Sequence, residues 1–250
     1  TNDNAVRAMA RSYGLHTTFL NSYLVLDNLD TMTQVQSEKK NTFLMMSNET
    51  PHEPNLLQKP DYVPQVEVDN YAIDRASEPL VVNGKELVLD TKTKLHHYHI
   101  NMATMLKIGE WFEYLQAEGL YDNSRILLVA DHAYWLNLSG DSRLEDEVDI
   151  SAYNPLLMVK DFHSDTFQVD YNFMTNADVP VLATHGLVPS INPFTGKSLV
   201  TNAKDQPIRV LESNHWQTSS NNGNTFKPDR WYEITGDFKN KDNWKFIGVH

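Results

Sequence analysis

The clearest hydrophobic pattern lies in the middle of the chain. Between residues 102 and 118, apolar side chains recur every three or four positions and form one stripe, which predicts an amphipathic helix that ends at Gly119. Residues 126–130 follow and are apolar throughout, as in a strand that is buried on both faces. The order of helix, turn and buried strand indicates a parallel α/β sheet.

Two further apolar runs predict strands of the same sheet. Residues 42–46 form one run, and the loop after it contains two prolines and His52. Residues 154–159 form the other. After it, residues 176–186 show a capping side chain, an early proline and a terminal glycine, which are the signals of a helix. We expect these two strands and residues 126–130 to lie in one sheet with helices on its faces.

The remaining segments predict peripheral structure. Residues 55–94 carry scattered prolines and many charges, which indicates a long surface excursion. Within it, residues 81–89 predict a hairpin around the turn Asn83-Gly84. Residues 201–250 place tryptophans among polar residues, which indicates short strands.

Composition excludes several classes of protein. With 21 Lys and Arg against 33 Asp and Glu, the 250-residue chain has a formal net charge of −12, and phosphate binding needs concentrated Lys and Arg, so we expect no nucleic acid partner. Hydrophobic residues make up 40%, enough for a substantial core. No apolar run approaches the roughly 20 residues of a membrane span. The absence of cysteine excludes disulfides, thiolate metal sites and a cysteine nucleophile.

Asp131 and His132 are the first candidates for chemistry, because they directly follow the apolar run 126–130. In open α/β sheets, ligands bind beyond the carboxyl ends of strands, and a carboxylate with an imidazole can hold a divalent metal. Adjacent strand residues point to opposite faces, so both side chains reach one site only if the chain leaves the strand at Asp131. The alternative interpretation makes Asp131 a turn or capping residue and His132 a surface side chain.

Histidines provide two further candidates. If the strands are parallel neighbours, His52 lies at the same sheet edge as Asp131 and His132 and donates a hydrogen bond to an anionic oxygen. The alternative is a loop histidine packed on prolines. Residues 94–99 hold three histidines but no acidic partner at matching spacing, so we expect a helix entry in which His99 lines a cleft.

Several segments together resemble the sulfatase-like proteins of the alkaline phosphatase superfamily. Residues 121–133, which contain Asp131 and His132, are similar to the family segment with the metal-binding Asp-His pair, and residues 111–115 match the helix before it. Further similar segments follow in the family's order, at residues 154–157, 175–187 and 196–199. The similarity spans about residues 42–200 and is strongest to the branch with lipoteichoic acid synthases and phosphoethanolamine transferases.

The resemblance implies an alkaline-phosphatase-like α/β fold, a mostly parallel sheet flanked by helices, with a short-stranded C-terminal tail. Residues 1–250 are then one domain, the C-terminal part of a catalytic domain, with its core at about 42–200 and its tail at 201–250. The implied activity is that of a metal-dependent hydrolase or phospho-group transferase. Its substrates are phosphate or sulfate esters, lipid or glycan linked, at the extracytoplasmic face of a bacterial membrane.

The resemblance also assigns roles to residues. Asp131 and His132 match ligands of a divalent cation, which is Mn²⁺, Mg²⁺, Ca²⁺ or Zn²⁺. His52 matches the histidine of a His-x-Pro loop that contacts the substrate phosphate or sulfate. His99 lies near the start of the helix before the Asp-His strand, where we expect a second substrate contact.

Two departures from the family pattern affect this interpretation. The serine and glycine that flank the family's Asp-His pair are Ala130 and Ala133 here. In addition, neither the nucleophile motif nor the first acidic metal ligand is found before Asn41. We expect the nucleophile, this acidic ligand and a membrane anchor upstream of Thr1 in a longer protein, and we expect residues 1–250 alone to be inactive.

A non-catalytic module that binds cell-wall carbohydrate is the competing hypothesis. In that protein the tail tryptophans Trp216, Trp231 and Trp244 would stack on sugar rings. The hypothesis leaves the Asp-His pair after the apolar strand without a role.

Overall fold

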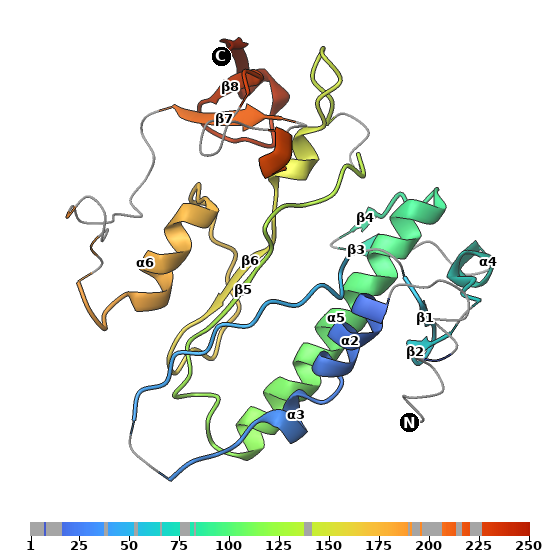
Figure 1. Cartoon of the computed structure of the whole chain (residues 1–250), viewed down its shortest axis with the longest axis vertical. Coiled ribbons are helices and arrows are strands. Elements are labelled where there is room, and N and C mark those ends of the chain that lie inside the picture. Colours follow the sequence, from blue (N-terminus) through green and yellow to red (C-terminus); the bar gives the residue numbers. More distant parts are fainter. Residues whose placement is uncertain are drawn as a thin grey trace. The chain divides into compact units, whose positions relative to one another are not determined.

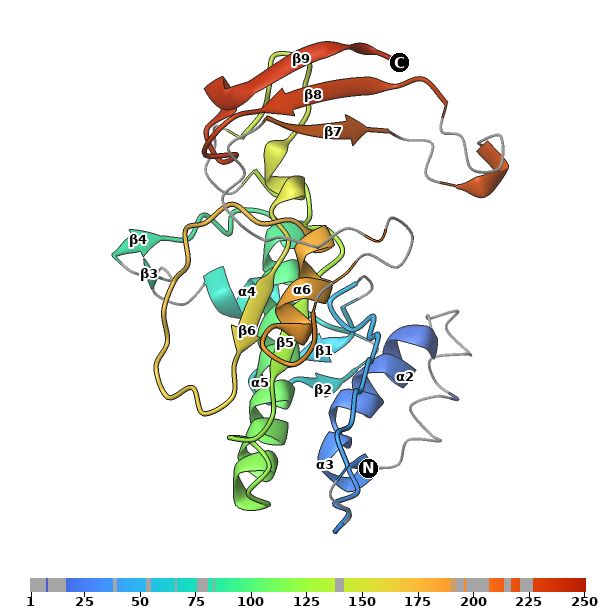
Figure 2. The same cartoon turned by 90° about the vertical axis from the view of Figure 1, so that its left-hand side faces the viewer.

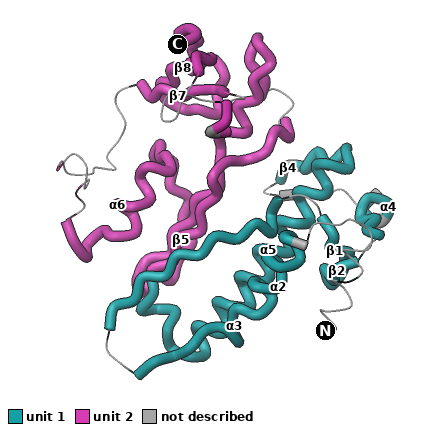
Figure 3. The backbone as a smooth tube through the Cα atoms, viewed as in Figure 1, with its two compact units in different colours: residues 1–124 teal, residues 125–250 magenta. Residues whose placement is uncertain are grey.

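The computed structural model divides the chain into two compact units, residues 1–124 (unit 1) and residues 125–250 (unit 2), which are described one at a time (Figure 3). The structure describes residues 8, 17–37, 40–52, 55–65, 67–75, 81–82, 84–137, 142–189, 191, 196, 207–213, 217–220 and 227–250. Thr1, Asn83, Trp216 and residues 197–199, which the sequence analysis named, lie outside this set.

Unit 1 is organised around one long helix, α5 (Figure 1). Its helices are α2 (Thr17–Leu26), α3 (Leu29–Met32), α4 (Asn70–Arg75) and α5 (Lys92–Ala117). Its strands form two small antiparallel pairs, β1 (Leu57–Gln58) with β2 (Val63–Pro64), and β3 (Val81–Val82) with β4 (Lys85–Glu86).

The helix predicted at residues 102–118 is confirmed, and it begins ten residues earlier, at Lys92. The side chain of Thr91 caps it by accepting a hydrogen bond from the Lys94 backbone N–H (3.2 Å). At the other end, Gly119 has φ +68°, and the Leu120 N–H reaches back to the Leu115 carbonyl oxygen (2.8 Å). This left-handed glycine termination satisfies carbonyls that the helix leaves open, so Gly119 ends the helix as the sequence predicts.

The core of unit 1 lies where α2 packs on α5 (Figures 1 and 2). It contains aromatic and aliphatic side chains of both helices and of the segment at β1: Phe19, Leu20, Tyr23, Leu56, Leu57, Ile100 and Ala103. Two polar contacts join α5 to the residues that follow α2 and α3. Lys107 pairs with Asp27 (2.8 Å), and Trp111 Nε1 donates to Thr33 Oγ1 (2.9 Å).

The hairpin predicted at residues 81–89 is also confirmed, with Gly84 at φ +75° in its turn.

The strand expected at residues 43–46 is wrong. Residues 41–49, all of them described, form neither helix nor strand. The side chains of Phe43, Leu44 and Met45 are 79%, 72% and 84% exposed. An apolar run indicates that a segment can form a strand, but a strand also needs a hydrogen-bonded neighbour, and the run does not specify one.

The described residues of unit 2 form one two-stranded and one three-stranded sheet. Strands β5 (Ile126–Val129) and β6 (Leu157–Lys160) make the first, and β7 (Ile208–Glu212), β8 (Arg230–Ile234) and β9 (Trp244–Val249) make the second (Figure 2). Its helical elements are the short 3-10 helices η1 (Ile150–Tyr153), η2 (Asn176–Asp178), η3 (Thr218–Ser220) and η4 (Lys241–Asn243), and the α-helix α6 (Val179–Thr184).

The mostly parallel sheet flanked by helices is also wrong. Both apolar runs that flank the Asp-His pair form strands, but β5 and β6 run antiparallel, with Ile126 opposite Lys160 and Val129 opposite Leu157. Parallel neighbours need a crossover connection, usually a helix, whereas antiparallel neighbours need none. The described residues between the two strands, 130–137 and 142–156, contain η1 and an isolated bridge between Arg143 and Asp149 but no crossover helix, and the chain returns beside β5 in the opposite direction.

The short strands expected in the tail are present as an antiparallel sheet of their own, in the order β7-β8-β9. Its buried side chains pack with the residues that precede and form η1: Val148, Ile150, Tyr232, Ile234 and Trp244. The Tyr232 hydroxyl also donates to the Asp146 carboxylate. Among the described residues, no helix combines the length and the hydropathy needed to cross a bilayer.

Replacing Ile100 by alanine tests the assignment of the unit 1 core. Ile100 is 2% exposed in the α2–α5 core, so Ile100→Ala removes buried methylene groups and leaves a cavity. We expect the free energy of unfolding to fall by about 2–5 kcal/mol, measured by urea denaturation. Leu106→Ala on the same helix is the control, because Leu106 is 49% exposed and its loss should change stability by less than about 0.5 kcal/mol. Equal losses in both variants would contradict the assigned core.

Candidate functional site

The backbone leaves the strand where the Asp-His pair begins. The β5–β6 ladder continues for one more hydrogen bond, from the Ala130 N–H to the Leu156 carbonyl oxygen (3.0 Å), and the chain then bends at Asp131. Residues 132–137 follow without regular secondary structure. The chain therefore leaves the strand at Asp131, and two adjacent side chains outside a strand are not forced to opposite faces.

The side chains of Asp131 and His132 turn toward one another. Oδ1 of Asp131 accepts a hydrogen bond from the His132 backbone N–H (2.8 Å), and Oδ2 lies 3.7 Å from His132 Nε2. The other ring nitrogen, Nδ1, lies 2.8 Å from the Ala133 carbonyl oxygen. A carbonyl oxygen only accepts, so Nδ1 is the donor in this contact, and in the Nδ1–H tautomer Nε2 has the lone pair beside the carboxylate.

This donor arrangement fits a divalent cation. Histidines that bind metals characteristically donate the second ring N–H to a carbonyl or carboxylate, which fixes the tautomer, and Ala133 has that role for His132. Two ligands at about 2.1 Å from one metal lie roughly 3 to 3.5 Å apart, so the 3.7 Å between Nε2 and Oδ2 needs little adjustment. Both side chains are open to solvent, Asp131 at 90% and His132 at 58% exposure.

The donor set is incomplete. Among the described residues, no group of three or more His, Asp or Glu side chains is arranged to hold a metal ion. If a cation bound here, Asp131 and His132 would supply two protein ligands, and water would complete the coordination shell. Two protein ligands give little chelation, which predicts weak binding. The nucleophile and the further acidic ligand expected upstream of Thr1 fall outside residues 1–250, so both stay predictions.

Asn176 and Arg125 fix the two ends of β5. Asn176 Nδ2 donates to the carbonyl oxygens of Ala130 and Asp131, each at 3.0 Å, at the end that carries the pair. At the start of the strand, the Arg125 guanidinium donates to the carbonyl oxygens of Ala183 (3.2 Å), in the last turn of α6, and of His185 (2.6 Å), just after that helix. The η2–α6 segment thus ties both ends of the strand and holds the backbone of Asp131 in place.

The backbone after the pair is attached to η1. The Ala133 N–H donates to the Ala152 carbonyl oxygen (2.9 Å), and Asp149 caps η1 by accepting from the Ser151 N–H (3.0 Å). Asp149 is 3% exposed. Its burial opposes ionisation, but hydrogen bonds from the hydroxyls of Ser142 and Ser151, both at 2.6 Å, outweigh that effect and lower the pKa of its carboxyl. The buried carboxylate of Asp149 therefore stabilises η1, the element to which the backbone of Ala133 is bonded.

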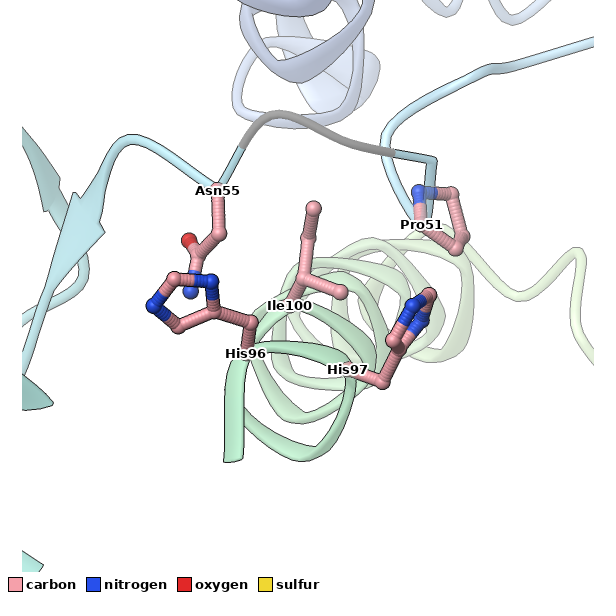
Figure 4. A pocket seen from close by; sticks show the side chains of 5 residues that line it. All are labelled: Pro51, Asn55, His96, His97 and Ile100. Atoms are coloured by element: carbon pink, nitrogen blue, oxygen red, sulfur yellow. The ribbon is translucent and has the colours of Figure 1, made fainter. Parts of the chain in front are cut away.

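His52 lies in unit 1, in the turn after the exposed apolar segment, and its backbone N–H donates to the Glu49 carbonyl oxygen (3.0 Å). Its side chain is exposed. Pro51, the residue before it, lines a small pocket with an empty volume of about 150 Å³. Ile100 stands in the middle of this pocket, with Asn55 and His96 on one side and Pro51 and His97 on the other (Figure 4). The Asp-His pair belongs to unit 2, so the expected convergence with His52 stays a prediction.

His99 is enclosed in unit 1, where it is 2% exposed. Its Nε2 donates to the Asp74 carboxylate, and its Nδ1 lies 2.9 Å from the Tyr62 hydroxyl. Lys59 pairs with the same carboxylate. Both ring nitrogens thus have partners within the unit, which is the arrangement of a structural histidine, and the substrate contact expected of His99 stays a prediction.

The charges around His99 compensate one another. Burial disfavours the ionised form of Asp74, but hydrogen bonds from Lys59 and His99 outweigh it, and the pKa of this carboxyl is lowered. Burial also raises the pKa of Tyr62 to about 12, with Tyr98 and Asp74 adding to the effect. Tyr62 has φ +51°, in the left-handed region, and its carbonyl oxygen accepts from the Tyr23 hydroxyl (3.0 Å). The network joins the β1–β2 segment, α4 and α5.

Sequence reasoning missed two residues of the site. The helix signals at residues 176–186 do not indicate that the Asn176 amide bonds to the carbonyls of Ala130 and Asp131, more than forty positions earlier in the chain. Trp135 was passed over, yet its ring lies 6.1 Å from that of His132, centroid to centroid. The aromatic pair Tyr134-Trp135, one residue after the Asp-His pair, is the available signal for Trp135, whereas the local sequence holds no signal for the contact of Asn176.

Because the pKa of Asp74 is lowered, the stability of unit 1 should depend on pH. A carboxyl whose folded pKa is lowered contributes stability that is fully present above its unfolded pKa and is lost as the pH falls through the folded pKa. We expect the free energy of unfolding to decrease between about pH 5 and about pH 3, and Asp74→Asn to reduce that decrease. Urea denaturation at several pH values measures it, with Asp122→Asn, in an exposed turn, as control. Identical pH profiles for wild type and Asp74→Asn would show that Asp74 is not the source of the loss of stability in acid.

Comparisons of the chain with protein-family models, with curated proteins and with solved structures found no match. The resemblance to sulfatase-like proteins therefore rests on the sequence segments alone.

Proposed function

We propose that this chain is part of a metal-dependent hydrolase or phospho-group transferase for phosphate or sulfate esters at the bacterial cell envelope, in which Asp131 and His132 hold a divalent cation. The supporting observation is the donor geometry at the end of β5. His132 Nε2 and Asp131 Oδ2 face one another at 3.7 Å, and the Ala133 carbonyl fixes the histidine tautomer that leaves Nε2 free to ligate.

The chemistry of this pair follows from charge. A bound divalent cation would polarise an ester oxygen and stabilise the anionic charge that develops during transfer. Asp131 contributes the negative charge that attracts the cation, and His132 contributes a neutral nitrogen ligand. Asn176 and the hydrogen bond from Ala133 to η1 keep the backbone of both residues fixed, which limits the reorganisation needed on binding.

The competing hypothesis of a carbohydrate-binding module has less support in the tail. Trp244 is 8% exposed and packs in the core of the β7–β9 sheet, where its Nε1 donates to the Phe238 carbonyl oxygen (2.6 Å). Trp231 is half-buried, and its Nε1 lies 3.4 Å from the His250 carbonyl oxygen. Both tryptophans therefore pack within their own sheet.

Calorimetric titration with Mn²⁺ tests the metal site. We expect a dissociation constant on the order of 0.1 mM or weaker, as for a partial oxygen–nitrogen site, and loss of that binding in Asp131→Ala and in His132→Ala. Asp122→Ala, which removes an exposed carboxylate elsewhere, should bind as the wild type does. Equal binding by wild type and Asp131→Ala would remove Asp131 from the site and refute the proposal.

Turnover of aryl phosphate and aryl sulfate with Mn²⁺ present tests the activity. We expect negligible turnover by residues 1–250, because phospho- and sulfo-transfer need a nucleophile at the metal and the family motif for it is not found in this sequence. Robust turnover that disappears in Asp131→Ala would place the nucleophile within the chain, with Thr17, Thr18 and Thr50 the first to be replaced. Of these, Thr50 is fully buried and bonds to Asn48.

Asn176→Ala tests the support of the pair. The substitution removes both hydrogen bonds to the carbonyls of Ala130 and Asp131 while leaving the two ligands in place. We expect Mn²⁺ binding to weaken about tenfold, since residues that orient metal ligands typically contribute that much. The matched control is Asn172→Ala, because Asn172 is exposed and bonds to Asp170. Unchanged affinity in Asn176→Ala would show that the bend at Asp131 holds its position without this support.

A further inference from the structure

We propose that Trp135 is a stacking platform for a sugar ring, so that the site selects esters carried on a pyranose over esters of an acyclic alcohol. This inference rests on the proposed function of Asp131 and His132, and it specifies the substrate class of the same site. It concerns a residue that neither the motif nor the donor geometry assigns.

Trp135 is a large aromatic side chain in solvent directly beside the pair. It is 58% exposed, whereas Trp244 packs in a core. Its ring centroid lies 6.1 Å from that of His132, with the two planes 39° apart. The ring of Tyr134 also lies near it, 5.5 Å away centroid to centroid in an edge-to-face arrangement at 68°. Neighbouring rings restrict the indole while leaving part of it open.

The backbone under these rings is held in place. The Ala133 N–H bonds to the Ala152 carbonyl oxygen (2.9 Å), and the Tyr134 carbonyl oxygen accepts from the Leu136 N–H (2.8 Å). The Ser151 hydroxyl adds a long contact to the same Tyr134 oxygen (3.5 Å). A platform that is ordered before its ligand arrives loses less conformational entropy on binding, which favours affinity.

The chemistry of the surface favours a sugar over other ring ligands. A pyranose has one face of C–H groups that can cover an indole while its hydroxyls remain in water, which suits a half-exposed tryptophan beside polar groups. A nucleotide chain also offers rings, but the net charge of −12 repels a polyanion. A glycerol ester has no flat face to cover the indole. The ring contact between Trp135 and His132 places the platform beside the imidazole that we propose as a metal ligand.

Two phosphate monoesters with the same head group test the inference. Glucose 6-phosphate and glycerol 3-phosphate are titrated by calorimetry into the Mn²⁺-loaded protein. We expect the wild type to bind glucose 6-phosphate roughly tenfold more tightly, the scale of one good aromatic contact. In Trp135→Ala this preference disappears while the affinity for glycerol 3-phosphate stays the same, and Trp135→Phe keeps part of the preference. Phe167→Ala removes an aromatic side chain that is 82% exposed elsewhere in unit 2, and it should behave as the wild type.

The outcomes separate this inference from the proposed function. No preference in the wild type, or an equal preference in Trp135→Ala, overturns the platform even if Mn²⁺ binding depends on Asp131. The preference for glucose 6-phosphate can also depend on Trp135 and persist without Mn²⁺, while the metal titration shows no binding. That result supports the platform and refutes the metal site. Circular dichroism spectra and Mn²⁺ affinity that match the wild type confirm that Trp135→Ala is folded and loads metal.

Discussion

The path of the backbone after β5 is the constraint on which the candidate site depends. In a continued strand, Asp131 and His132 would point to opposite faces, and no single cation would reach both. The ladder with β6 ends at Ala130 instead, and the chain bends there. Asn176 holds the carbonyls on both sides of the bend, and the bond from Ala133 to η1 holds the residue after the pair. Hydrogen bonds to backbone, rather than burial, thus position two side chains that remain in solvent.

Histidines in the two units show how the same side chain serves opposite purposes. His99 is buried with both ring nitrogens engaged, and its partner Asp74 is further neutralised by Lys59, so the imidazole joins three elements of unit 1. His132 is exposed with one ring nitrogen engaged and the other beside a carboxylate. A ring with both nitrogens satisfied stabilises a fold, whereas a ring with one fixed and one open nitrogen is prepared to ligate.

Local signals in the sequence predicted local structure well. The helix at residues 102–118, its end at Gly119 and the hairpin around Gly84 depend on side-chain periodicity and on glycine conformation, which neighbouring residues determine. Sheet pairing depends on segments that are distant in the sequence. Apolar runs therefore do not predict the antiparallel direction of β6 or the absence of a strand at residues 41–49. The same distinction applies to the site. The Asp-His pair is adjacent in sequence and is therefore a local signal, whereas its contact with Asn176 exists only in the fold.

The short segment from Ala130 to Trp135 combines three properties on which the proposed chemistry depends. Asp131 and His132 supply the donors, the Ala133 carbonyl selects the tautomer, and Trp135 supplies an apolar ring within 6.1 Å of the imidazole. Because one stretch of backbone carries all three, a displacement of that stretch would change ligand geometry, tautomer and ring position together. Its attachment at both ends, to Asn176 and to η1, is therefore as important to the proposed chemistry as the donors themselves.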